Sequence, residues 1–215
     1  MSLTVSRDLS CSPARRLPAL GLLLLPLLML TLSACSSSAR AERAWERGKE
    51  LWEDGKEDEA TRILERGLRD DEDLHGMRLT LARIYYEKGE RPHLEQRRLL
   101  AQAEVAYGRN DAKLGRSLET RAEQSKLDAA VHYGIAAGHL DVIIDGADDP
   151  PVIAHAAYLR MRIAIFTENW VMARKAADVA IEKGGIKGTP REAKFRKFLD
   201  LIDRKPKPLM PAPGS

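Results

Sequence analysis

Cys35 is the residue whose neighbours specify a reaction most clearly. It follows a positively charged Arg15-Arg16 pair and a nearly continuous apolar stretch from Leu17 to Leu32, and two small residues stand directly before it. A positive start, an apolar core and small residues at a cleavage site are the parts of a secretory signal peptide. Cleavage at this point would make Cys35 the first residue of the mature chain.

The motif Leu32-Ser33-Ala34-Cys35 resembles the lipobox of bacterial lipoproteins. The resemblance implies that the Cys35 sulfur forms a thioether with diacylglycerol, that cleavage occurs before it, and that the new amino group is acylated, for example with palmitate. Residues 1–34 are then a signal peptide that is removed, and residues 35–40 a lipidated polar tether. An ordinary N-terminal anchor helix is the alternative, although Pro18 and Pro26 break a stretch that is short for a membrane span.

The residue after the cysteine bears on location. In enterobacterial lipoproteins an aspartate there marks retention in the inner membrane, whereas this chain has Ser36. The resemblance therefore favours the outer membrane, on its periplasmic face, over the inner membrane. Each buried methylene contributes ~0.8 kcal/mol, and two acyl chains already anchor a protein stably. Three chains would make release from the membrane improbable.

Charge and cysteine content change once the signal is removed. The chain carries +3. The segment before Cys35 supplies +2 of this through Arg7, Arg15 and Arg16 against Asp8, which leaves about +1 on the mature body. This near balance does not support a nucleic-acid partner. Cys11 leaves with the signal and Cys35 is committed to lipid, so the fold must hold without disulfides.

Motifs for catalysis or for a metal are missing from the rest of the chain. It has no HExxH, no phosphate-binding loop, no GxSxG and no remaining cysteine nucleophile. Asp71, Asp73 and Gly76 have part of a calcium-loop pattern, but Ala82 stands where the bidentate glutamate should be. We therefore expect Asp70–Asp73 to be a solvated turn, and we expect no metal, no cofactor and no enzymatic activity.

One enzyme hypothesis stays open beside this expectation. His132 and His139 are seven residues apart and can share a helix face, and Asp145, Asp148 and Asp149 follow. They would form a site only if they converged in one pocket. The sequence argues against this, because Gly138 is expected to interrupt the helix and the aspartates precede Pro150-Pro151 as a polar linker.

The elements that position these residues are helices. From Ala41 the chain has helical periodicity, punctuated by Gly, Pro, Asn and Asp turns, with no run of alternating β-branched residues. Small and apolar residues recur after 34 residues: Gly48 as Ala82, Leu51 as Tyr85, Gly55 as Gly89 and Gly67 as Ala101. We expect an all-α fold.

The recurrence resembles the tetratricopeptide repeat, whose 34-residue unit is a helix–turn–helix. The resemblance implies a short helical solenoid over residues 41–188. Its first unit, Ala44–Asp73, has its turn at Gly55, and the second has its turn at Gly89, with Leu99 and Ala103 on the following helix. Asn110–Asp149 is helical without a consensus, and His155–Gly184 forms a further unit.

The C-terminal part completes this arrangement. Thr189-Pro190 is a helix start, and Phe195, Phe198, Leu199 and Ile202 form an apolar stripe. We therefore expect a C-terminal capping helix over residues 189–205. Residues 206–215 contain four prolines and are expected to be a disordered tail.

The first helices of repeat units line the concave side of such a solenoid. The corresponding positions predict a partner-binding groove, and all three units place a cation at the central position. Carboxylate-bearing peptides suit cations flanked by aromatic residues. The alternative is that the aromatic residues are packing residues and that the arginines pair with nearby glutamates. The predicted groove residues are Trp45, Lys49, Trp52, Leu79, Arg83, Tyr86, Tyr158 and Arg162.

Together these features predict a membrane-anchored periplasmic adaptor that binds a protein partner of the cell envelope, in envelope assembly or in secretion or pilus assembly. Lipoproteins with helical repeats serve such roles, and no residue here selects one partner. The alternative is a structural lipoprotein that binds peptidoglycan or polysaccharide through its Pro/Lys tail. An enzyme of unrecognised type is the third hypothesis.

Overall fold

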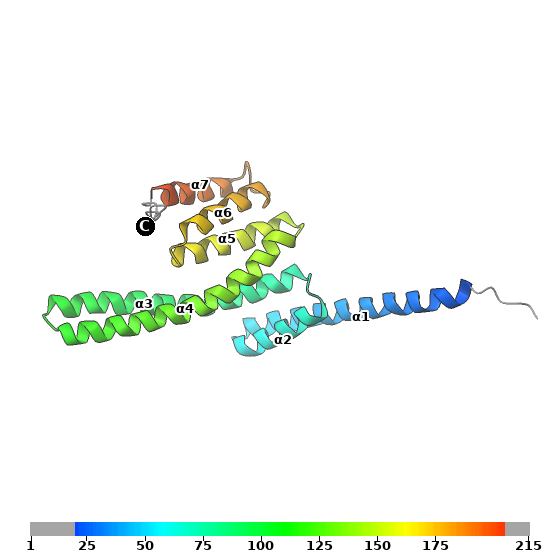
Figure 1. The fold of residues 1–215 in the computed structure, drawn as a ribbon, viewed down its shortest axis with the longest axis horizontal. Coiled ribbons are helices and arrows are strands. Elements are labelled where there is room, and N and C mark those ends of the chain that lie inside the picture. Colours follow the sequence, from blue (N-terminus) through cyan, green and yellow to red (C-terminus); the bar gives the residue numbers. More distant parts are fainter. Residues whose placement is uncertain (1–19, 205–215) are drawn as a thin grey trace, which may run out of the picture.

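The computed structural model describes the backbone of residues 20–204 and the side chains of residues 37–204. Every regular element within this range is a helix, which confirms the all-α prediction. Figure 1 shows a long hairpin with shorter helices stacked on one side of it. The helices are α1 (Leu20–Glu53), α2 (Glu57–Asp70), α3 (His75–Gly108), α4 (Ala112–Gly146), α5 (Pro150–Phe166), α6 (Trp170–Glu182) and α7 (Pro190–Asp203).

The first helix pair, α1 and α2, forms where the sequence predicts it. Gly55 has a φ of 77° in the turn between them, a conformation that glycine adopts without strain. Gly48 lies against Leu64, and a Cβ added at Gly67 would be 2.9 Å from the Cβ of Ala44. The two small residues therefore let α1 and α2 cross closely. Residues 36–40, where the sequence predicts a polar tether, are helical in α1.

The prediction for the second unit is also wrong. Helix α3 runs through Gly89 and Pro92 without a turn, and α4 runs through Gly138 without an interruption. Gly89 is small for a different reason: a Cβ there would lie 2.7 Å from the Tyr133 ring on α4. The helix that pairs with the first half of α3 is therefore the second half of α4.

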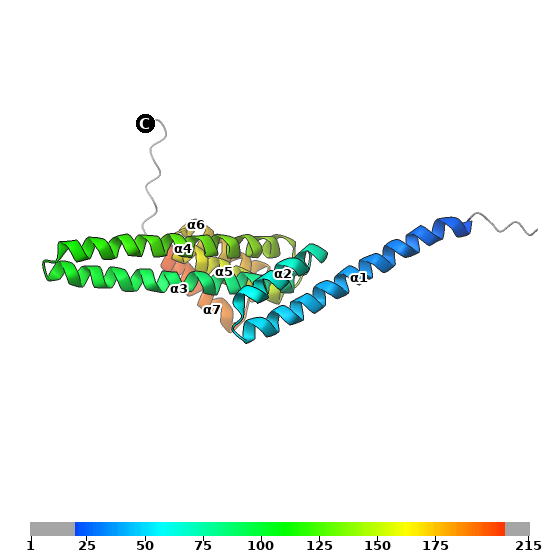
Figure 2. The same cartoon turned by 90° about the horizontal axis from the view of Figure 1, so that it is seen from below.

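The remaining halves of α3 and α4 form a hairpin that projects beyond the other helices (Figure 2). Leu99 and Ala103 are buried there against Leu118 and Ala122 in a cluster separate from the rest of the core. The sequence predicts Leu99 and Ala103 on the second helix of a repeat, but both lie on α3 itself. They instead hold together the end of a long antiparallel hairpin.

Helices α5, α6 and α7 complete the body. Asn169 caps α6 by accepting a hydrogen bond from the Met172 amide, and Pro190 opens α7 as the sequence predicts. The contacts follow a regular order, in which α1, α3 and α5 touch in succession and each even-numbered helix packs on the odd-numbered helix before and after it. This order leaves one side of α1, α3 and α5 on a common face.

Candidate functional site

Each of the three predicted groove cations lies over an aromatic ring. The Lys49 ammonium is 4.5 Å from the centre of the Trp45 ring, and the Arg83 guanidinium is 4.6 Å from that of Trp52. Cations placed over ring faces are held by the ring quadrupole while their outer N–H groups remain available. The Lys49 and Arg83 head groups are therefore positioned before any ligand arrives.

Arg162 has a similar arrangement on α5. Its guanidinium lies 5.1 Å from the Tyr86 ring and 5.9 Å from the Tyr158 ring. It also forms an ion pair with Glu90 at 3.2 Å, as the packing alternative anticipates. Tyr86 is only 5% exposed, and its hydroxyl donates to the same carboxylate. Arg162 and Tyr86 are thus tied into the α3–α5 contact.

Trp45 positions α1 on α3. Its indole N–H donates to the Thr80 hydroxyl at 3.0 Å. Its ring also lies against Gly76, where an added Cβ would be 2.4 Å from the nearest ring carbon. Leu79 is partly buried against the main core. Lys49 forms an ion pair with Glu46 at 2.7 Å. Within the predicted set, Trp52, Arg83 and Tyr158 are therefore the residues with the most freedom to meet a partner.

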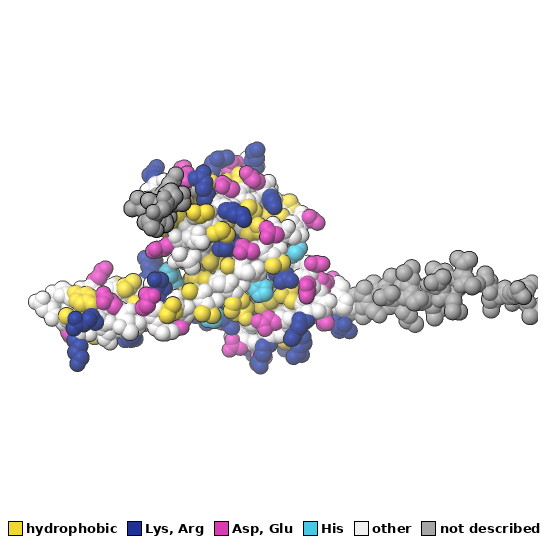
Figure 3. All heavy atoms as spheres, in the orientation of Figure 1, with side chains coloured by type: hydrophobic (Ala, Val, Ile, Leu, Met, Phe, Trp, Pro, Cys, Tyr) yellow, Lys and Arg dark blue, Asp and Glu magenta, His cyan; other side chains and the backbone are white. Residues whose placement is uncertain are grey.

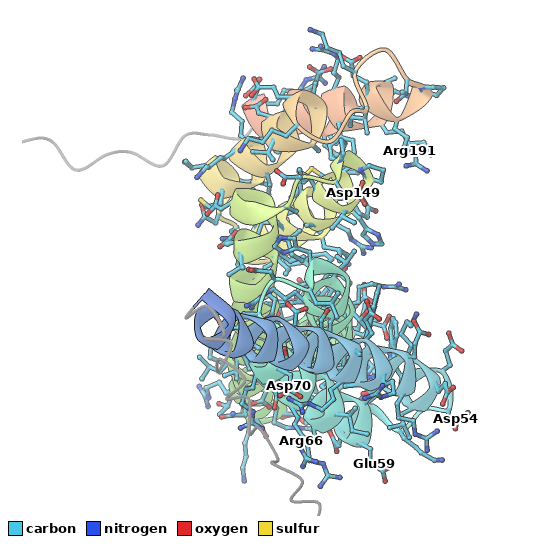
Figure 4. All side chains as sticks on the ribbon, turned by 90° about the vertical axis from the view of Figure 1, so that its right-hand side faces the viewer. Asp54, Glu59, Arg66, Asp70, Asp149 and Arg191 are labelled. Carbon is cyan, nitrogen blue, oxygen red and sulfur yellow. The ribbon has the colours of Figure 1, made fainter. Side chains whose placement is uncertain are left out.

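A hollow of about 600 Å³ lies between α5 and α7, and Tyr158 is the predicted groove residue in its lining. Tyr158 packs edge-on against Phe195 in its wall, and Phe198 and Ile186 add apolar surface. Arg191, at one end of this side of the molecule in Figure 4, lies on the rim. The hollow is thus an apolar pocket with cations at its mouth.

His155 links the two parts of this surface. Partial burial lowers its pKa, and the charges of Arg83 on α3 and Arg191 on α7 lower it further. Arg191 lines the hollow between α5 and α7 together with His155. Among the ion pairs of residues 37–204, none involves Arg83, Arg191 or Lys194. This end of the groove carries positive charge that no neighbouring carboxylate neutralises.

We call this surface the basic groove; it consists of the predicted residues together with the hollow between α5 and α7. Sequence reasoning missed its α7 end because Phe195 and Phe198 have the spacing of a capping helix's buried stripe. The sequence did contain a signal for this end of the surface. By their spacing, Arg191, Lys194 and Phe198 share a face of α7 with Phe195. The groove residues that sequence reasoning did not find are His155, Ile186, Arg191, Lys194, Phe195 and Phe198.

The residues of the enzyme hypothesis lie in different places. His132 and His139 each stack on Tyr85, and the centre of each imidazole ring lies 6.3 Å from the centre of the Tyr85 ring. The two histidines therefore share a face of α4. Asp145 instead lines a hollow with Arg160 and Met172 between α4 and α6. Burial, with a smaller effect of Arg78, lowers the pKa of His139, which favours the neutral ring. This arrangement is that of histidines packed beside a tyrosine.

Asp70 ends α2, and residues 71–73 form the turn that the sequence predicts. The Asp71 carboxylate accepts the Asp73 amide at 3.1 Å, which closes the connection between α2 and α3. Among the residues that the structure describes, no group of three or more His, Cys, Asp or Glu side chains is placed to hold a metal ion.

The predicted lipidation site lies outside the described side chains. Residues 1–19 and the side chain of Cys35 are among those that the structure does not describe, as is the tail from residue 205. Within the described part of the chain, no helix combines the length and the apolar character needed to cross a membrane. The lipobox therefore stays a prediction from sequence.

Comparisons with protein families, with curated proteins and with solved structures found no match to this chain.

Proposed function

We propose that the chain is a lipid-anchored adaptor, without catalytic activity, that binds a carboxylate-bearing segment of an envelope protein in the basic groove. The observation that carries the proposal is a pair of arginines, Arg83 and Arg191, that form no ion pair within residues 37–204. Arg83 lies over Trp52, and Arg191 stands at the mouth of the hollow beside Phe195. Such a surface suits an extended segment with acidic residues and one bulky apolar side chain.

The energetics favour this class of partner. A carboxylate that meets Arg83 or Arg191 gains a charge-assisted hydrogen bond, which contributes ~1.5–3 kcal/mol. The guanidinium groups give up little on binding, because no ion pair within residues 37–204 has to be broken at either position. Arg162 contributes less by this argument, since it is already paired with Glu90.

The anchor explains how modest affinity would suffice. A lipidated Cys35 would confine the domain to the membrane surface and raise the effective concentration of any partner held there. The predicted place is the periplasmic face of the outer membrane. The pathway would be envelope assembly or secretion or pilus assembly, and the location rests on the lipobox motif Leu32–Cys35 alone.

The test is crosslinking in intact envelopes, followed by identification of the captured proteins. A Lys49→Glu, Arg83→Glu, Arg191→Glu variant should lose its partners while keeping its helical circular dichroism. The matched control reverses three exposed cations at the end of the hairpin, Lys113, Arg116 and Arg121, and should keep them.

Two outcomes would contradict the adaptor proposal. Equal capture by the groove variant and the control would exclude the groove as the binding surface. Loss of capture on deletion of residues 206–215, with binding of the intact chain to purified sacculi, would favour the structural lipoprotein that binds peptidoglycan through its tail.

A further inference from the structure

A separate hollow lies where the α3–α4 hairpin passes the C-terminal end of α5. It has a volume of about 530 Å³, and none of its lining residues belongs to the basic groove. In Figure 3, Lys or Arg side chains (dark blue) and a His side chain (cyan) are visible in the corner between the hairpin and the helices stacked on it. The volume is within the range of small-molecule sites.

The spacing of the lining residues explains how the two arms of the hairpin form one hollow. His93 and Arg97 are one turn apart on α3, and on α4 Lys126, Ala130 and Tyr133 follow at intervals of four and three residues. Residues at these intervals lie on the same face of a helix. One face of each arm therefore borders the hollow, and the end of α5 closes it on a third side.

Three rings form the wall of the hollow. The centres of the His93 and Phe166 rings are 4.7 Å apart, and the Tyr133 ring lies 5.7 Å from that of Phe166. Burial, with a smaller effect of Arg97, lowers the pKa of His93, so its imidazole is neutral at neutral pH. The wall is therefore uncharged, and it offers ring surface on which an aromatic group can pack.

The charged residues of the hollow favour an anion. Arg97 and Lys126 line it together with one carboxylate, that of Glu168, so their net charge is positive. The Lys126 ammonium lies 3.7 Å from the Glu123 carboxylate. Arg97 forms no ion pair within residues 37–204. Its guanidinium is thus available to bind a carboxylate through two parallel hydrogen bonds.

Tyr133 adds a polar group that the fold leaves unsatisfied. The residue is 2% exposed, and its hydroxyl has no hydrogen-bond partner among the described residues. A buried hydroxyl without a partner destabilises a fold, so an acceptor that reaches it contributes more than one at a hydrated surface. The hydroxyl is covered, and the side chain has to turn slightly toward the hollow to meet a ligand.

We propose that this hollow binds a small aromatic carboxylate. The carboxylate contacts the Arg97 guanidinium, with the Lys126 ammonium as a second positive charge, and it accepts a hydrogen bond from the Tyr133 hydroxyl. The aromatic ring packs against Phe166 and the neutral imidazole of His93. This site is independent of the adaptor proposal, because neither the groove variant nor its control changes a residue of this hollow.

The test is calorimetric titration of the full chain, held in nanodiscs of phosphatidylcholine, with empty nanodiscs as the blank. The probes are 2-naphthylacetate and 2-naphthylmethylamine, which share a ring system and carry opposite charges. We expect 2-naphthylacetate to bind about tenfold more tightly than the amine. Such a ratio corresponds to the loss of a charge-assisted hydrogen bond.

Matched variants locate the bound probe. Arg97→Gln should weaken binding of 2-naphthylacetate about tenfold, because it removes the unpaired cation. Arg98→Gln, its control, removes the same charge from the next residue, which pairs with Glu95 and does not line the hollow, and it should leave binding unchanged.

Two further variants change the hollow itself. Ala130 is exposed in its lining, so Ala130→Leu fills space without disturbing the core and should abolish binding. Tyr133→Phe removes the unpartnered hydroxyl. It should weaken binding about threefold, while the melting temperature of the ligand-free chain does not fall.

Each opposite result overturns the proposal. Absence of binding to the parent chain, or equal binding of the acid and the amine, would mean that the hollow does not select an aromatic anion. Equal losses for Arg97→Gln and Arg98→Gln would mean that the general positive charge of the hairpin attracts the probe. Unchanged binding by Ala130→Leu or by Tyr133→Phe would mean that the probe lies elsewhere.

Discussion

Gly67→Leu should destabilise the fold, whereas the same substitution at Gly138 should stabilise it. At Gly67 the new Cβ would lie 2.9 Å from the Cβ of Ala44 and 2.8 Å from the Cε of Met77. Ala44 has no rotamer to change, and Met77 is fully buried. Helices α1 and α2 would therefore have to separate. At Gly138 the added side chain enters open space.

The magnitudes follow from two opposing effects. Replacing glycine by leucine inside a helix gains ~0.8–1 kcal/mol of helix propensity at either position. Overpacking typically costs ~1–3 kcal/mol, and a whole leucine side chain at the α1–α2 crossing belongs at the upper end. The net loss at Gly67 is then about 2 kcal/mol, and the net gain at Gly138 about 1 kcal/mol.

The assay is thermal unfolding of residues 37–204, followed by circular dichroism at low protein concentration. A change of 1 kcal/mol shifts the melting temperature of a domain of this size by about 2–4 °C. We expect a fall of about 4–8 °C for Gly67→Leu and a rise of about 2–4 °C for Gly138→Leu. An unchanged melting temperature for Gly67→Leu, or equal shifts for both variants, would refute the packing argument.

Cys35→Ser should abolish palmitate labelling and leave an uncleaved or soluble precursor, because only the thiol accepts diacylglycerol; equal labelling of both chains would end the lipoprotein hypothesis. The free energy of unfolding should fall between about pH 7 and pH 5. Burial lowers the native pKa of His93 and His139, so the unfolded chain, with histidines near ~6.5, binds more protons as the pH falls. Denaturant titrations across this range should show a smaller slope for His139→Gln. Leu99→Ala should speed hydrogen exchange in the projecting part of the α3–α4 hairpin and leave the amides around Leu64 protected, because the two residues belong to separate clusters.

Several parts of this protein were predictable because their signals lie within a few residues. Pro190 at the start of α7, the turn at Gly55 and the Asp71 turn each depend on local backbone preference. The all-α class follows from helical periodicity sustained along the chain. The stacking of cations on aromatic rings was partly predictable, because Trp45 and Lys49 lie one turn apart on the same helix.

The tertiary structure decided what a local signal leaves ambiguous. Glycine marks a turn where the backbone needs a positive φ and a close contact where another element packs on it, and the residue itself does not say which. Gly55 has the positive φ, whereas Gly89 is helical beneath Tyr133 on α4. The long α3–α4 hairpin, and with it the hollow that extends the basic groove to α7, depends on such contacts between residues far apart in the sequence. Their energy comes from burial against a distant element, which no window of neighbouring residues contains.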